Sequence, residues 1–151
     1  MRTVLLVWLL VGCAGYRAGS FRARQLDFTG QHATVGCLDI SIRERPPVRG
    51  ADVLQYTFGN RCDHPAMVDL AAANVIGRLG DGREVELIAY DPNREIRPLP
   101  IDGRMVGQEA IAYQAATEVS QICVDAGGIG HGQPQWLCFP GVASRVAEVS
   151  P

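Results

Sequence analysis

A chain of 151 residues has room for one domain, and about two-thirds of its unfolded surface could be buried on folding. Its 14 basic and 16 acidic residues nearly balance, so no excess of positive charge indicates nucleic acid as a partner. All of the basic residues are arginine, which we interpret as the mark of a GC-rich coding sequence.

The first twelve residues have the layout of an export signal. Met1-Arg2-Thr3 supplies a short positive start, and Val4–Val11 forms an uncharged apolar run. This run is too short to cross a bilayer as a helix, but its length suits the hydrophobic part of a signal peptide. We therefore predict a signal peptide over residues 1–12.

The tetrad Leu10-Val11-Gly12-Cys13 resembles the lipobox of bacterial lipoproteins. The resemblance implies that the bond before Cys13 is cut and that this cysteine carries fatty acyl chains such as palmitate. Two or more chains would anchor the protein stably in a membrane. Ala14 replaces the Asp that marks inner-membrane retention in enteric bacteria, so the expected location is the outer membrane of the cell envelope. Two other interpretations are an ordinary cleavage site near Ala14-Gly15 and a buried N-terminal strand.

Residues 13–32 are predicted to be the lipidated N-terminus and a flexible linker. They are polar, rich in arginine and glycine, and show little hydrophobic periodicity. Such a segment would hold the following domain off the membrane. We expect that domain to be a β-sandwich over residues 33–151.

Alternating apolar residues predict the first strands of the domain. One strand should contain Leu38, Ile40 and Ile42 and end at Pro46-Pro47, and the next should cover Val53–Phe58 with Leu54, Tyr56 and Phe58 on one buried face. Gly59-Asn60-Arg61 should break that strand, and Cys62-Asp63-His64-Pro65 should turn the chain. A further strand is predicted at Val68–Ala72.

Four cysteines remain once Cys13 is set aside, and an even number in an exported chain predicts disulfides, with three possible pairings. If the first two strands form a hairpin centred near Val48 or Arg49, residues whose numbers sum to about 97 face each other. Cys37 and Cys62 would then meet at its open end. Cys123 and Cys138 lie symmetrically about the glycine-rich turn at 127–132, between predicted strands at 118–125 and 135–139. We therefore predict Cys37–Cys62 and Cys123–Cys138.

The remaining segments also favour strands. Leu79-Gly80-Asp81-Gly82 predicts a hairpin between strands at 68–78 and 85–90, and Glu109–Gln114 alternates again. Residues 142–149 could form a last edge strand or one helical turn. About seven short strands and no long helix predict an all-β antiparallel sandwich.

This layout resembles the immunoglobulin-like domains of small exported bacterial lipoproteins. The likeness rests on the Y-x-F-G-N strand end at 56–60, the hairpin at Asp81-Gly82 and the E-x-I-x-Y strand at 109–113. The cysteine pair of antibody domains, which flanks a core tryptophan, is missing here.

No recurring catalytic motif is present, so we predict a protein that is not an enzyme and needs no cofactor or metal ion. Glu84 and Glu86 are expected on the solvated face of a strand, where charge discourages edge pairing. Tyr56 and Tyr113 are expected in the core, with their hydroxyls at its rim. Cys62, His64 and Met67 could form a soft-metal site only if Cys62 were free.

The leading hypothesis is a lipid-anchored envelope protein that acts as an accessory or adhesion-type subunit of a larger complex through protein contacts. Its lysine-free composition is similar to that of envelope lipoproteins from gliding, GC-rich Gram-negative bacteria, which suggests surface motility machinery. The sequence indicates no small-molecule substrate. The alternative hypothesis is a periplasmic module that binds a small ligand or a metal through His64, Met67 and neighbouring loops.

Overall fold

The computed structural model describes residues 29–91 and 95–141. The predictions for the signal peptide, for Cys13 and for residues 142–149 lie outside these ranges. Within them the protein is all-β, with antiparallel strands and one short helix. The first strand begins at Gln31, inside the segment expected to be linker.

The described strands number eleven instead of about seven. They are β1 (Gln31–Val35), β2 (Leu38–Val48), β3 (Ala51–Asn60), β4 (Ala66–Val68), β5 (Val75–Arg78), β6 (Glu84–Glu86), β7 (Ile88–Tyr90), β8 (Leu99–Ile101), β9 (Val106–Gln114), β10 (Gln121–Asp125) and β11 (Trp136–Pro140). The helix α1 spans Ala126–Ile129. The count is higher because two predicted strands, at 68–78 and 85–90, are each divided between two sheets, and because β1 and β8 were not predicted.

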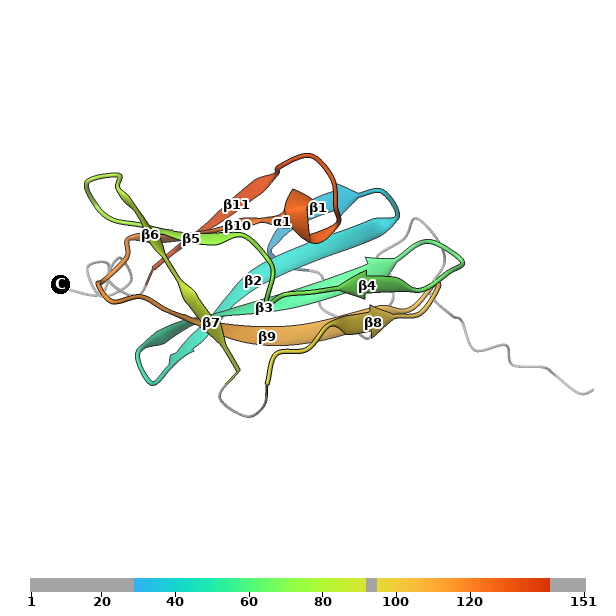
Figure 1. Cartoon of the computed structure of the whole chain (residues 1–151), viewed down its shortest axis with the longest axis horizontal. Coiled ribbons are helices and arrows are strands. Elements are labelled where there is room, and N and C mark those ends of the chain that lie inside the picture. The colour runs from blue at the N-terminus through green and yellow to red at the C-terminus, as the bar shows by residue number, and fades with distance from the viewer. Residues whose placement is uncertain (1–28, 92–94, 142–151) are drawn as a thin grey trace, which may run out of the picture.

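Two open sheets pack against one hydrophobic core (Figure 1). One sheet has the order β1-β2-β3-β9-β7, the other has the order β11-β10-β5-β6, and β4 and β8 form a separate ribbon near one end. Ile40, Tyr56 and Ile111 of the first sheet share a core cluster with Ile122 and Phe139 of the second. The sheets therefore form two layers, as a sandwich requires.

Strand β3 lies at the centre of the larger sheet and is buried along its whole length. Its inward residues follow the predicted alternation, and Tyr56 and Phe58 have no exposed surface. The opposite face is also buried, contrary to the prediction of one buried face. Gln55 on that face accepts a hydrogen bond from Arg45, and Thr57 accepts one from Gln108. Neighbouring polar side chains thus cover this face of β3.

The prediction that Pro46-Pro47 ends the first strand was wrong, because β2 continues through both prolines to Val48. The β2–β3 register shifts between Arg45 and Val48, and this irregularity accommodates two residues that lack an N–H. Arg49 and Gly50 then make the turn with φ values of 51° and 80°, the signs that a two-residue type I′ hairpin requires.

Two other predicted strands were too long. The chain after Val68 does not continue as a strand, because the Asp69 carboxylate accepts hydrogen bonds from the backbone of Ala71 and Ala72 and turns the chain. The strand predicted at 85–90 is divided at Leu87, which is 9% exposed and packs into the core. Strand β6 before it pairs with β5, and β7 after it pairs with β9 of the other sheet.

The strand predicted at 118–125 begins only at Gln121, and the glycine-rich turn that follows contains α1. Asp125 caps this turn because its carboxylate accepts the N–H groups of Gly128 and Gln135.

Candidate functional site

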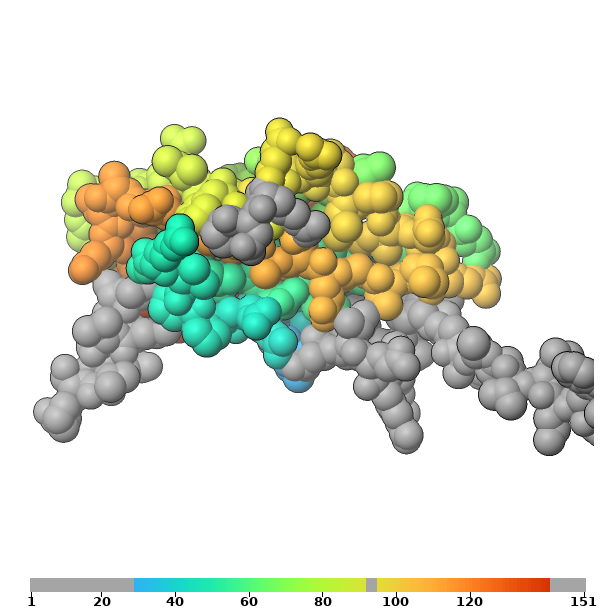
Figure 2. All heavy atoms as spheres, turned by 90° about the horizontal axis from the view of Figure 1, so that it is seen from below, coloured from blue at the N-terminus to red at the C-terminus, as the bar shows by residue number. Residues whose placement is uncertain are grey.

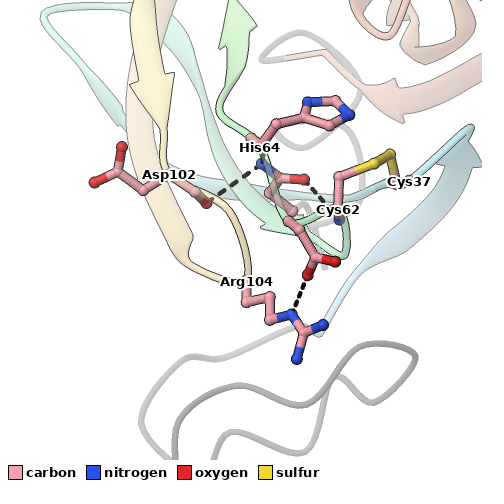
Figure 3. A network of polar contacts seen from close by, with 7 residues as sticks. Cys37, Cys62, His64, Asp102 and Arg104 are labelled. Atoms are coloured by element: carbon pink, nitrogen blue, oxygen red, sulfur yellow. Dashed lines mark hydrogen bonds and ion pairs between the residues drawn. A yellow bond between two sulfur atoms is a disulfide. The ribbon is translucent and has the colours of Figure 1, made fainter.

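The Cys37–Cys62 disulfide closes one end of the larger sheet (Figure 3). The two cysteines have Cα atoms 5.5 Å apart and lie just beyond the Leu38–Asn60 pair that ends the β2–β3 ladder. The predicted pairing is confirmed, because the ladder brings both residues to the open end of a hairpin. We call residues 60–67 and 100–105, together with Cys37, the cysteine-pinned end.

Asn60 connects the loops of the cysteine-pinned end and has no exposed surface. Its side-chain amide donates to the carbonyl oxygens of His64 at 2.8 Å and Ile101 at 3.0 Å. Its side-chain oxygen accepts the backbone N–H of Cys62 at 3.0 Å. One buried side chain therefore holds the loop after β3 against the end of β8.

Arg104 fastens the same two loops on the outside. Its backbone N–H donates to the carbonyl of Cys62 at 2.9 Å, and its guanidinium forms an ion pair with Asp63. The hydrogen bond from Arg104 holds the pKa of the Asp63 carboxyl below its usual value. Gly103 lies so close to Asp63 that a Cβ atom there would come within 2.4 Å of its carbonyl group. The loops fit only because residue 103 has no side chain.

Arg61 ties this end to the turn between β1 and β2. Its backbone N–H donates to the carbonyl of Cys37 at 2.7 Å, and its guanidinium donates to Gly36 at 2.8 Å. The guanidinium also pairs with the buried carboxylate of Asp39 at 3.2 Å. Backbone bonds, side-chain bonds and a disulfide thus hold three connections together.

Two methionines are exposed at this rigid end. Met67 on β4 is 58% exposed and Met105 before β9 is 54% exposed. The backbone of Met105 accepts a hydrogen bond from Asn60, so this residue belongs to the same assembly of loops. Methionine adapts to irregular surfaces and is common where proteins bind one another. The two exposed methionines therefore lie on loops that are already held in place by the disulfide and by hydrogen bonds.

The disulfide removes Cys62 as a thiolate ligand. Over residues 29–91 and 95–141, no three His, Cys, Asp or Glu side chains converge as a metal would require. His64 is exposed, with a ring nitrogen 3.3 Å from the carbonyl of Pro65. His32 lies on β1 and His131 follows α1, so the topology does not bring the three histidines together at one loop.

The second predicted disulfide, Cys123–Cys138, is also confirmed. Its cysteines face each other directly across β10 and β11, with Cα atoms 4.0 Å apart. Glu84 and Glu86 are exposed on edge strand β6, as predicted.

Tyr56 and Tyr113 are buried as predicted, but their hydroxyls are not at the rim of the core. The two hydroxyl oxygens lie 2.5 Å apart and share a hydrogen bond inside it. Burial raises the pKa of both phenols well above the ordinary value.

Sequence reasoning missed Asn60 and Arg104 as organising residues. The Y-x-F-G-N pattern placed Asn60 at a strand end, but its partner Ile101 lies 41 residues further along the chain. No local pattern predicts which segment will meet a strand end at that distance.

In the part of the chain that the structure describes, no helix has both the length and the apolar character needed to cross a membrane. Comparisons with protein-family models, with curated proteins and with solved structures found no match to this chain.

Proposed function

We propose that this chain is a non-enzymatic, lipid-anchored protein of the bacterial cell envelope. Cys13 is its anchor, and an immunoglobulin-like sandwich follows a flexible linker. The protein acts as an accessory or adhesion-type subunit of an envelope complex, at the outer membrane, and it contacts its partner through the cysteine-pinned end.

The observation that carries this proposal is the pair of disulfides, Cys37–Cys62 and Cys123–Cys138. Disulfides persist in oxidising compartments such as the bacterial periplasm and are rare in the cytosol. All four cysteines of the described domain are used in them. An exported domain is what the sequence Leu10-Val11-Gly12-Cys13 implies. Two separate features therefore support the same compartment.

The contact role is supported by how the polar groups of the cysteine-pinned end are used. The side chains of Asn60 and Arg61 donate hydrogen bonds to backbone carbonyls of the loops, and Arg104 forms an ion pair with Asp63. These groups stiffen the surface that carries Met67 and Met105. A stiff surface loses little conformational freedom when a partner binds, which favours affinity. Envelope machinery that moves cells over surfaces is one setting for such a subunit.

Of the alternative, a metal-binding or small-ligand module, the metal-binding form would require Cys37–Cys62 to be reduced. Only then would Cys62 supply the thiolate that a soft metal needs beside His64 and Met67. A count of free thiols in the exported protein separates the two proposals.

The test is site-specific photo-cross-linking in native membranes. A photoreactive residue replaces Met67 or Met105, and a control replaces Arg83, whose side chain is 75% exposed on the β5–β6 turn. We expect one envelope protein to be cross-linked from both methionine positions and not from Arg83. Mass spectrometry of the same samples reports acylation at Cys13, and a Cys13→Ser variant should lose the cross-link.

Equal capture from Arg83 and the methionines would contradict a specific surface. A membrane-bound chain without acyl groups on Cys13 would refute the lipid anchor.

A further inference from the structure

Arginine is distributed unevenly over the described domain. Residues 29–91 and 95–141 contain eight arginines and fourteen Asp or Glu residues, so this part of the chain is acidic. The five arginines outside β2 and its turn into β3 all form ion pairs with carboxylates: Arg61, Arg78, Arg83, Arg97 and Arg104. The other three, Arg43, Arg45 and Arg49, all lie on this one hairpin, and of these Arg43 also has an interaction partner.

The end of the hairpin, residues 45–50, combines positive charge with exposed apolar surface. We call these residues the hairpin tip. Arg45 donates to the side chain of Gln55, and Arg49 occupies the turn. Neither has a carboxylate partner within the described ranges. Val48 is 39% exposed, and Pro46-Pro47 beside it is exposed as well. Figure 2 shows the hairpin as teal spheres on the surface of the molecule.

The hairpin tip and the cysteine-pinned end lie at opposite ends of the same strands. Leu38 adjoins the disulfide and Val48 is at the tip, ten residues further along β2. An extended strand covers about 33 Å over that distance. A surface in contact with the tip therefore leaves the cysteine-pinned end free.

The chain enters the domain beside the middle of β2, between the cysteine-pinned end and the hairpin tip. Strand β1 is antiparallel to β2 and begins at the Gln31–Ile42 pair, so β2 runs on towards the tip beyond the point of entry. Thr29 accepts a hydrogen bond from Ser41 there. Only fifteen residues lie between Cys13 and Thr29. The sequence between them contains Arg17, Arg22 and Arg24 and one acidic residue, Asp27.

We propose that the hairpin tip rests on the membrane that holds Cys13 and contacts its anionic lipid headgroups. This inference depends on the proposed lipid anchor. Guanidinium groups bind phosphate oxygens well, and Val48 with the two prolines can enter the apolar edge of the headgroup region. The acidic remainder of the domain is repelled by the same surface. The domain is thereby oriented with its cysteine-pinned end pointing away from the bilayer.

The test measures binding to vesicles by the full chain with Cys13→Ser, which cannot be acylated. The readout is the ratio of its affinity for vesicles of phosphatidylcholine with phosphatidylglycerol to its affinity for phosphatidylcholine alone. Apolar attachment by the N-terminal segment contributes to the affinity for both kinds of vesicle, so it cancels in this ratio. The tip variant is Arg45→Gln/Arg49→Gln. The control, Arg83→Gln/Arg97→Gln, changes the net charge equally at two other exposed arginines.

We expect the ratio to fall about thirty-fold in the tip variant and to change by much less in the control. High salt should abolish the preference for anionic vesicles. Equal losses in the two variants, or no preference in the parent chain, would overturn the proposal. Circular dichroism verifies that each variant is folded.

A second measurement needs no substitution. Phenylglyoxal labels arginine, and anionic vesicles should slow labelling of Arg45 and Arg49 several-fold while leaving Arg83 and Arg97 unchanged. Equal slowing at all four sites would refute contact through the tip. Mass spectrometry measures acylation at Cys13 separately. A result that refutes the lipid anchor is therefore distinguished from one that refutes membrane contact through the hairpin tip.

Discussion

The substitution Asn60→Ala tests whether one buried side chain organises the cysteine-pinned end. It removes the hydrogen bonds that the amide donates to the carbonyl oxygens of His64, Ile101 and Asp102, and the one that its oxygen accepts from the N–H of Cys62. Each buried polar group left without a partner costs about 1–3 kcal/mol. Because Cys62 is half-buried and water reaches part of the loop, we expect a total loss of about 3–5 kcal/mol. That is a large share of the roughly 5–15 kcal/mol that stabilises a typical domain.

Urea unfolding with both disulfides intact measures this loss. At a slope of about 2 kcal/mol per M, the midpoint should fall by roughly 2 M. The matched control is Asn74→Ala, because Asn74 is exposed and its side chain makes no hydrogen bond that would be lost. That variant should stay within about 0.5 kcal/mol of the parent. A loss below about 1 kcal/mol for Asn60→Ala would show that the disulfide and Arg104 hold the loops without it.

The substitution Asn60→Asp separates hydrogen bonding from shape. A carboxylate of the same size can still accept the N–H of Cys62, but its second oxygen faces the carbonyl oxygens of His64 and Ile101. The charged form is therefore disfavoured, and the pKa of the new carboxyl should rise in the folded state. Folding then takes up a proton, so this variant should gain stability as the pH falls towards the usual carboxyl range. A variant as stable as the parent at pH 7 would contradict the role of the amide.

Four further predictions concern the core and the loops. Replacing Tyr56 or Tyr113 by Phe should lower the free energy of unfolding by about 1–3 kcal/mol, because the other hydroxyl loses its hydrogen-bond partner. The double variant should lose less than the sum of the two single losses, which a double-mutant cycle measures. Burial raises the pKa of both phenols, so near pH 10 only the unfolded chain releases these protons. The free energy of unfolding should therefore fall above pH 10, and it should fall less in the double Tyr→Phe variant. Gly103→Ala should cost about 1–3 kcal/mol in urea unfolding, whereas Gly80→Ala, with no atom within 4 Å of the new Cβ, should be nearly neutral. Breaking Cys37–Cys62 by double Cys→Ala substitution should cost about 3 kcal/mol, and a midpoint unchanged from the parent would contradict a stabilising bridge.

The disulfides could be predicted because each depends on one hairpin. The residue numbers of the two partners in a hairpin add up to nearly the same value along its length. The positions of the turn and of the cysteines are therefore enough to match Cys37 with Cys62 and Cys123 with Cys138. The same local logic failed at Pro46-Pro47, where a shift in register keeps the strand going. It failed again at Leu87, because alternation along 85–90 is the same whether a strand stays in one sheet or crosses to the other. Patterns along the chain give the faces of a strand, and only the packed core determines which sheet the strand joins.

The position of β2 and β3 links the stability of this domain to its proposed role. Both strands reach the cysteine-pinned end on one side and the hairpin tip on the other. Their inward side chains, such as Ile40 and Phe58, have no exposed surface, so the core fixes the separation between the two ends. A domain that met a membrane at its tip would then present Met67 and Met105 at a set height of about 33 Å, whatever the length of the linker. If the linker alone set that height, changes in its length would move the methionines relative to a fixed partner. Deleting residues between Cys13 and Thr29 should therefore leave the cross-links from Met67 and Met105 in place when the tip is intact, and weaken them in the Arg45→Gln/Arg49→Gln variant.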